Sequence, residues 1–213
     1  MSLAPLTPTR KAADAERRQR ILEAAERAFV RHGFHATTMQ HVAEEIGMSA
    51  GNLYRYFPSK EAIVEGLCAV DQAGRARAFA ELMAHNGNIM EAISAGLREH
   101  VLGRPAEKAR MIVEIWAEAA RNPAVDAITR SIDSDVLAKI EHLIFIAKER
   151  GEASPAVDAA SVARFFFTYV GGLMKRLALE PDLDAEAETA RASELFIALC
   201  KGALAPIGTG GSR

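Results

Sequence analysis

The chain has 213 residues, of which 49% are hydrophobic and 25% are charged, which suits a globular protein and excludes a fibrous or disordered one. Its formal net charge of −2 does not indicate a nucleic-acid partner, but residues 1–60 carry nine Lys and Arg against six Asp and Glu. This basic excess at the N-terminal end could form a local basic patch or simply a solvated helix face.

Helical periodicity runs through the sequence, and we find no strand-like alternation of any length. Glycines stand where helices should end, as at Gly33 and Gly47, because glycine readily adopts the left-handed backbone of a helix C-terminus. Pro105, Pro123 and Pro155 suit the first positions of three later helices. The predicted helices span about residues 14–32, 38–46, 50–56, 60–84, 89–102, 106–121, 124–150, 155–179 and 185–204.

This order predicts an all-α fold of nine helices in two parts. Residues 17–77 are expected to form one domain behind a flexible basic arm, residues 1–16, because the first three helices are compact and close in sequence. Residues 78–205 hold long amphipathic helices that can form an independent bundle. The fourth helix should be the only element that both parts share, and residues 206–213, rich in Gly and Ser, should form a disordered tail.

Residues 38–57 carry the pattern on which the functional interpretation depends. Gly47 stands between two short helices and supplies the positive φ of a tight turn. Apolar residues four apart let the two helices pack on each other. These residues are Val42 and Ile46 in the first helix, and Leu53 and Phe57 in the second. Two short helices joined by about three residues, with a glycine in the turn, form a helix-turn-helix.

The second helix of this pair keeps one face that is small at its N-terminal end and polar throughout. A recognition helix enters the major groove of DNA by that end, where small side chains allow a close approach. Arg55 can pair with guanine and Asn52 with adenine. Candidates for contacts with phosphates are Thr38, Tyr54, Tyr56 and Lys60. The alternative is a plain helical hairpin within a core.

Four short segments carry a resemblance: residues 20–25, 29–34, 36–38 and 51–61. Through them, residues 18–66 resemble the N-terminal domain of the TetR family of bacterial transcriptional regulators. The resemblance implies a homodimer on a palindromic operator of double-stranded DNA, and usually repression that a small molecule relieves. The positions that match the family's DNA contacts are Thr38, Ser49, Ala50, Gly51, Asn52, Tyr54, Arg55, Tyr56 and Lys60. Relatives often carry Lys where this chain has Ala50, and Ala cannot make the phosphate contact of that Lys. We expect the basic arm to supply this contact instead.

The same resemblance implies that the last two helices pair with their copies in a four-helix dimer interface. Three phenylalanines at 165–167 place rings on more than one face of the eighth helix. Glycines at positions 171 and 172 each lower the stability of the helix by about 1 kcal/mol relative to Ala. Close approach to a partner helix would offset this cost. The candidates are Phe166, Val170, Gly171, Leu173, Leu177, Leu195, Phe196 and Leu199. The alternative is a core within one chain.

A ligand pocket is harder to locate from the sequence. Residues on the fifth, sixth and eighth helices, with Glu114 and Glu118 beside them, could line a pocket for a hydrophobic or cationic molecule. The candidates are Met90, His100, Met111, Trp116, Phe165 and Tyr169. A Met and aromatic stripe at helical spacing is more often ordinary core. The sequence identifies no ligand.

Other classes of function find little support. Cys68 and Cys200 form no paired motif, the histidines lack metal-ligand spacing, and we can place no phosphate-binding loop or nucleophile–base pair. We therefore expect no enzyme, metal or cofactor. No run of 18 apolar residues could span a membrane, and a cytoplasmic location is expected. A DNA-binding protein controlled by a protein partner stays a second interpretation, which a solid core among helices four to eight would favour.

Overall fold

The computed structural model describes residues 10–84, 88–98, 101 and 103–203. Within these ranges the regular structure is entirely helical, so the predicted all-α class is confirmed. The helices are α1 (Arg10–His32), α2 (Met39–Ile46), α3 (Ala50–Tyr56), α4 (Lys60–Ala84), α5 (Ile89–Leu97), α6 (Ala106–Ala119), α7 (Pro123–Glu149), α8 (Ala159–Leu179) and α9 (Ala185–Cys200). No helix in the described ranges is long and apolar enough to cross a membrane.

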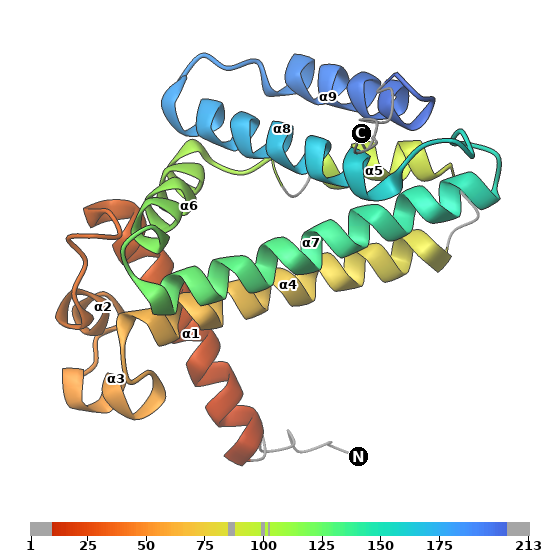
Figure 1. The fold of residues 1–213 in the computed structure, drawn as a ribbon. Coiled ribbons are helices and arrows are strands. Elements are labelled where there is room, and N and C mark those ends of the chain that lie inside the picture. Colours follow the sequence, from red (N-terminus) through yellow and green to blue (C-terminus); the bar gives the residue numbers. More distant parts are fainter. Residues whose placement is uncertain (1–9, 85–87, 99–100, 102, 204–213) are drawn as a thin grey trace, which may run out of the picture.

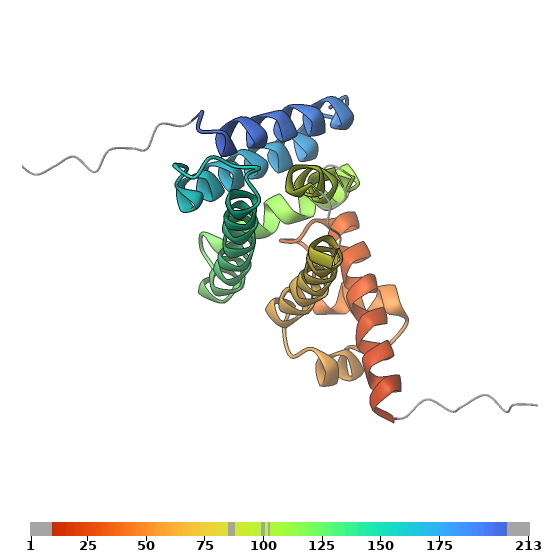
Figure 2. The ribbon, with the colours of Figure 1, turned by 90° about the vertical axis from the view of Figure 1, so that its right-hand side faces the viewer.

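The helices form a head and a body. In Figure 1, the short helices α2 and α3 lie at one end of the long helix α4, next to α1. Helices α4 and α7 run side by side away from this head, and α8 and α9 lie above them with α5. Figure 2 shows the head and the pair α8 and α9 on opposite sides, with α6 between them. The head therefore meets the body through α4 and α6.

Side-chain caps begin several helices where the sequence predicts them. The side-chain oxygens of Thr38, Ser49 and Asp184 each accept a hydrogen bond from the N–H three residues further on, at 3.3, 3.3 and 2.9 Å. Gly33 and Gly47 end α1 and α2 with φ of +77° and +72°. These caps satisfy backbone groups that a helix leaves without partners at its ends, which explains why the boundaries could be predicted.

Some boundaries differ from the expected ones. Helix α1 begins at Arg10, so residues 10–16 extend it instead of forming a flexible arm, because Ala, Arg, Lys and Glu all favour helix. Helix α8 begins after Asp158 and not at Pro155, because the Asp158 carboxylate accepts from the N–H of Ser161 at 3.2 Å and caps the helix there. Helix α6 ends at Ala119, two residues before the expected end. The helix ends expected at residues 102 and 204, residues 1–9 of the predicted arm and the predicted tail 206–213 lie outside the described residues.

Two apolar clusters hold most of the fold. The first joins α1, α2, α3 and the start of α4, and its largest buried side chains include Phe29, Phe34 and Phe57. Met111 and Ile115 of α6 belong to the same cluster. The second cluster joins α5, α7, α8 and α9. The expectation that the fourth helix alone is shared by both parts is therefore wrong, because α6 completes the core of the head.

Gly66 allows α4 to approach the rest of the head. A Cβ atom on it would lie 2.8 Å from Leu22 Cδ2 and 3.0 Å from Phe57 Cε1, and both neighbours are buried. We expect Gly66→Ala to lower the free energy of unfolding by about 1 kcal/mol, because overpacking costs about 1–3 kcal/mol and Ala regains about 1 kcal/mol in a helix. Urea denaturation measures this change.

Gly74→Ala is the matched control on the same helix. A Cβ atom at Gly74 would meet nothing within 4 Å, so only the helix propensity should change. We expect this variant to gain up to about 1 kcal/mol of stability. If both variants shifted the unfolding midpoint in the same direction, the close approach at Gly66 would not control the packing of α4.

Candidate nucleic-acid interface

The turn between α2 and α3 has the geometry of a helix-turn-helix. Gly47 adopts the left-handed conformation, and the N–H of Met48 donates to a carbonyl of α2 at 2.9 Å, which closes that helix. Val42 and Leu53 are fully buried in the head cluster, whereas Ile46 is only partly buried. Because both helices are tied to one core, α3 presents its remaining face in a single orientation.

The outward face of α3 carries the residues predicted to contact DNA. Exposed residues on it or at its start are Ser49, Gly51, Tyr54 and Arg55, and the partly buried ones are Ala50, Asn52 and Tyr56. Tyr54 is 50% exposed. Arg55 makes no hydrogen bond or ion pair with any residue that the structure describes. Its guanidinium is therefore available to an acceptor outside the chain, and Thr38, at the start of α2, is exposed as well.

One arginine of the basic segment supports α3 from within the head. Arg18 Nη1 donates to the carbonyl of Tyr56 at 2.8 Å, and the guanidinium carbon lies 4.4 Å from the ring centre of Phe57. The carbonyl end of a helix is partly negative, so a cation placed there stabilises it. The sequence shows Arg18 only as one of the basic residues near the N-terminus, because its partners are 38 and 39 residues away in the chain.

Lys60, expected to reach a DNA phosphate, is bonded within the head. Its ammonium donates to the carbonyls of Phe34, Thr37 and His35 at 2.9, 3.2 and 3.3 Å. Burial lowers the pKa of Lys60. An ammonium has three N–H donors, so these carbonyls use all of them. The geometry gives Lys60 a structural role in the α1–α2 loop, residues 33–38, and leaves it no donor for a phosphate in this conformation.

Helix α6 holds the same loop from the other side. The N–H of Phe34 donates to the carboxylate of Glu114. Gly33 brings its backbone so close that a Cβ atom there would lie 3.2 Å from Glu114 Oε2. Glu118, one turn further along α6, lies 3.9 Å from His35 Nδ1. Sequence reasoning placed these two carboxylates beside a ligand pocket, but the structure places them against the head, a contact that no local pattern signals.

Comparison with known proteins identifies the family. Residues 21–67 match the family model described as bacterial regulatory proteins, tetR family. Residues 89–201, more than half of the chain, match the model described as BetI-type transcriptional repressor, C-terminal. The chain belongs to the TetR family. It is thus a helix-turn-helix transcriptional regulator and not an enzyme, in agreement with the interpretation of residues 38–57.

Individual relatives and solved structures match both parts of the chain. The HTH-type transcriptional regulator UidR of Escherichia coli (strain K12) is 30% identical over 182 residues, which cover 84% of this chain and 90% of UidR. The structure of Salmonella enterica GusR has a TM-score of 0.70 at 27% identity, covering 91% of this chain and 98% of GusR. Bacillus subtilis FadR, solved in complex with stearoyl-CoA, shares the fold with a TM-score of 0.74 at 18% identity, covering 85% and 98%.

The residues predicted to line a ligand pocket of this TetR-family chain are not brought together. Met111 is buried in the head cluster, and Tyr169 packs on the body cluster. Trp116 and Phe165 are exposed, at 39% and 45%. The side chain of Met90 and all of His100 lie outside the described residues. Within those residues, no group of three or more His, Cys, Asp or Glu side chains could hold a metal ion.

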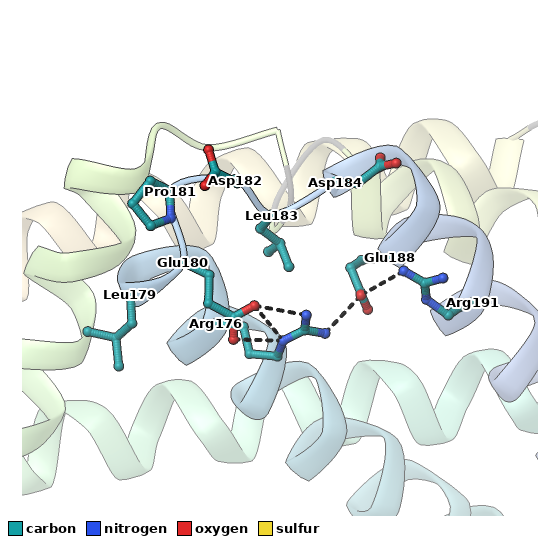
Figure 3. Close-up of a pocket in the computed structure, with 9 residues that line it drawn as sticks. All are labelled: Arg176, Leu179, Glu180, Pro181, Asp182, Leu183, Asp184, Glu188 and Arg191. Carbon is teal, nitrogen blue, oxygen red and sulfur yellow. Dashed lines mark hydrogen bonds and ion pairs between the residues drawn. The ribbon is translucent and has the colours of Figure 1, made fainter.

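An open cleft of about 420 Å³ lies at the turn between α8 and α9 (Figure 3). Arg176 pairs with Glu180 at 2.9 Å and with Glu188 at 2.8 Å, and Arg191 pairs with Glu188 at 2.8 Å. Hydrogen bonds from Arg191 and Arg176 lower the pKa of Glu188. These ion pairs connect α8 to α9. Because both arginines of the cleft are already paired with carboxylates, the cleft offers no unpaired cation to a ligand.

Most residues predicted for the dimer interface pack inside their own chain. The fully or nearly buried ones are Phe166, Leu173, Leu177, Phe196 and Leu199, with exposures of 8% or less. The rings of Phe166 and Phe196 are 4.6 Å apart between centroids. Val170, Gly171 and Leu195 are partly buried. A side chain that its own chain covers has little surface left for a partner, so these five residues fit the alternative of an internal core.

Arg55 allows a direct test of the DNA-contacting face. We expect Arg55→Ala to weaken binding to the chain's own operator by about 1–3 kcal/mol and to relax the preference at one base pair, because a bidentate contact to a base is lost. Fluorescence anisotropy with the operator and its single-base variants measures both effects. Arg77→Ala, which removes an exposed arginine of α4, is the control. An Arg55 variant with wild-type affinity would show that α3 does not read bases.

Lys60 distinguishes a structural role from a phosphate contact. We expect Lys60→Met to lower the free energy of unfolding by about 1–3 kcal/mol, because the partly buried carbonyls of Phe34 and Thr37 lose their donor. The slope of log affinity against log salt concentration should stay at its wild-type value for the folded variant. Each lost phosphate contact would reduce that slope by about 0.9. A reduced slope with unchanged stability would restore the phosphate contact expected from the sequence.

Proposed function

We propose that the protein is a homodimeric repressor that binds a palindromic operator with α3 of each copy and leaves it when a small molecule binds in the body. The observation that carries this proposal is the outward face of α3, where Arg55 is exposed and unpaired among the described residues. A face of this kind on a helix-turn-helix suits insertion into the major groove. Membership of the TetR family supports the role of a regulator.

Within the DNA contact, the residues divide by what their surroundings allow. We assign Asn52 and Arg55 to base edges and Ala50 and Gly51 to close approach, since a Cβ atom at Gly51 would meet nothing within 4 Å. The residues left for phosphates are Thr38, Ser49, Tyr54 and Tyr56. Lys60 supports these contacts by holding the α1–α2 loop. Exposed cations in the first turns of α1 can supply the charge that Ala50 lacks.

For the dimer, we assign the outward surfaces of α8 and α9. A Cβ atom at Gly171 or Gly172 would meet nothing within 4 Å in its own chain, so the internal packing does not explain two adjacent glycines inside a helix. Phe165 and Leu179 of α8 are large apolar side chains that are 45% and 62% exposed. A partner helix close to the glycines would cover such residues and offset their cost.

For release, we assign a transmission route through both helices that join head and body. A ligand that shifts α4 or α6 moves the α1–α2 loop, because Lys60 of α4 and Glu114 of α6 both bind that loop. The loop leads directly into α2 and so sets the position of α3. Two half-sites about one helical turn apart tolerate little change in the spacing of the recognition helices. FadR, which shares this fold, was solved in complex with stearoyl-CoA, and this supports the binding of a small molecule by the present chain.

Selection of bound sequences from a random DNA pool tests the DNA-binding part of this function. The full-length protein should enrich one palindromic sequence whose halves are about one helical turn apart. Light scattering at micromolar concentration should give the mass of a dimer. A monomer, or an enriched sequence without two-fold symmetry, would refute the dimeric assignment, and no enrichment at all would refute specific binding.

Glu114 tests the transmission route. We expect Glu114→Ala to weaken operator binding about fivefold, or about 1 kcal/mol, because the N–H of Phe34 loses its acceptor and the loop loses its fixed position. Glu107→Ala removes an exposed carboxylate from the first turn of the same helix and should change affinity less than twofold. Equal affinities of the two variants would remove α6 from the route.

A further inference from the structure

Two charged residues in the middle of α4, Asp71 and Arg75, lie on the side of the helix that is partly buried. Between residues 69 and 77 of this helix, only Asp71 and Arg75 are partly covered, and the other residues are exposed. The same side carries Val64 and Cys68, which are buried and partly buried. An inward stripe of a helix is normally apolar, so two charged residues at these positions call for a reason other than core packing.

Arg75 is an incompletely paired cation. Two of its nitrogens, Nε and Nη2, are buried and have no hydrogen-bond partner in the structure. Its third nitrogen, Nη1, lies 3.6 Å from Asp71 Oδ2, which is longer than a hydrogen bond. A guanidinium presents five N–H donors in a planar fork. Burying such donors without acceptors costs free energy, which a bound acceptor would offset.

The carboxylate nearest to Arg75 is already engaged elsewhere. Asp71 Oδ2 accepts a hydrogen bond at 2.9 Å from Nη2 of Arg104, whose side chain is only 12% exposed. Arg104 lies in the segment that leads into α6, so this contact joins α4 to α6. Two guanidinium groups thus share one carboxylate, and these three side chains together carry an excess of one positive charge.

The neighbour of this group on α4 adds no negative charge. Cys68 lies one turn before Asp71, and burial raises the pKa of its thiol to about 11. The thiol is therefore neutral near pH 7. Leu67 and Cys68 also contact the apolar head cluster. Beside this neutral thiol, Arg75 keeps two donors that no carboxylate satisfies, so an organic anion can accept from them.

We propose that Arg75 binds the carboxylate or phosphate group of an organic anion, and that this anion is the effector of the regulator. The inference rests on the proposed function and names the chemical class of the effector. The effector is an acidic molecule, and not the hydrophobic or cationic molecule expected from the sequence. The unpaired nitrogens Nε and Nη2 can form the two parallel hydrogen bonds that a carboxylate or phosphate accepts. Because these nitrogens are covered, the anion reaches them only when neighbouring side chains move.

This movement links the site to DNA release. Arg75 lies on α4, and its partner network reaches the start of α6 through Asp71 and Arg104. These are the two helices that hold the α1–α2 loop through Lys60 and Glu114. An anion that draws Arg75 away from Asp71 therefore acts on both connections between body and head at once.

Thermal unfolding of the full-length protein tests the site without knowledge of the natural effector. The probes are sodium phosphate and sodium octanoate, each compared with sodium chloride at equal ionic strength and pH, and neutral octanamide controls for the apolar chain. At about ten times its Kd, a bound probe should raise the Tm of the wild type by roughly 3–5 °C. Phosphate and octanoate distinguish the two anionic groups.

Arg75→Met and Arg75→Gln should lose this rise, whereas Arg77→Met, which removes an exposed arginine two residues away, should keep it. In chloride alone, both Arg75 variants should unfold at or above the wild-type Tm, since two buried nitrogens without acceptors are removed and Asp71 keeps its hydrogen bond from Arg104. Unfolded or clearly less stable variants would show that Arg75 is structural. Such a loss of stability would overturn the proposal. So would anions that raise the Tm of the wild type no more than they raise the Tm of the Arg75 variants.

Operator binding separates this inference from the proposed function. Both Arg75 variants should bind the selected operator like the wild type, and the anion that raises the Tm should weaken binding at least tenfold for the wild type alone. If the anion raises the Tm but leaves operator affinity unchanged, the anion site stands and its role as effector site is refuted. If operator binding is intact and no anion acts on Arg75, the anion site is refuted and the DNA-binding function stands.

Discussion

The α1–α2 loop, residues 33–38, is the constraint on which the position of the recognition helix depends. Its backbone makes few of the regular hydrogen bonds of a helix, yet it lies against the buried core of the head, so its polar groups need partners from elsewhere. Lys60 supplies donors for three of its carbonyls, and Glu114 accepts the N–H of Phe34. Helices α4 and α6 thereby determine where α2 begins.

This arrangement makes the head dependent on the body. The apolar cluster of α1, α2 and α3 is completed by Met111 and Ile115 from α6, so the DNA-binding part is not a closed unit attached by one helix. A displacement in the body acts on the head through apolar packing and through polar contacts at the same loop. Two connections also restrict the head to fewer orientations than a single helix would.

Basic residues of this chain serve three different purposes that composition cannot separate. Arg55 is exposed and unpaired among the described residues, which suits DNA. Arg18 and Lys60 bind backbone carbonyls inside the head. Arg75 is held in the body with two unpartnered nitrogens. The net charge of −2 counts all of these cations alike and does not show which of them face solvent.

The helix-turn-helix could be predicted from the sequence, because its signals are local. Thr38, Gly47 and Ser49 act on backbone groups within a few residues, and the spacing of Val42, Leu53 and Phe57 follows from helical periodicity. Three features could not be predicted and depend on how the whole chain folds: which residues of α8 and α9 form the internal core, which carbonyls Lys60 binds, and the contact of α6 with the head. The hydrogen-bond partners of Lys60 and of Glu114 in α6 are 23 to 80 residues away in the chain. No local propensity or spacing encodes which of several chemically suitable partners a side chain will meet.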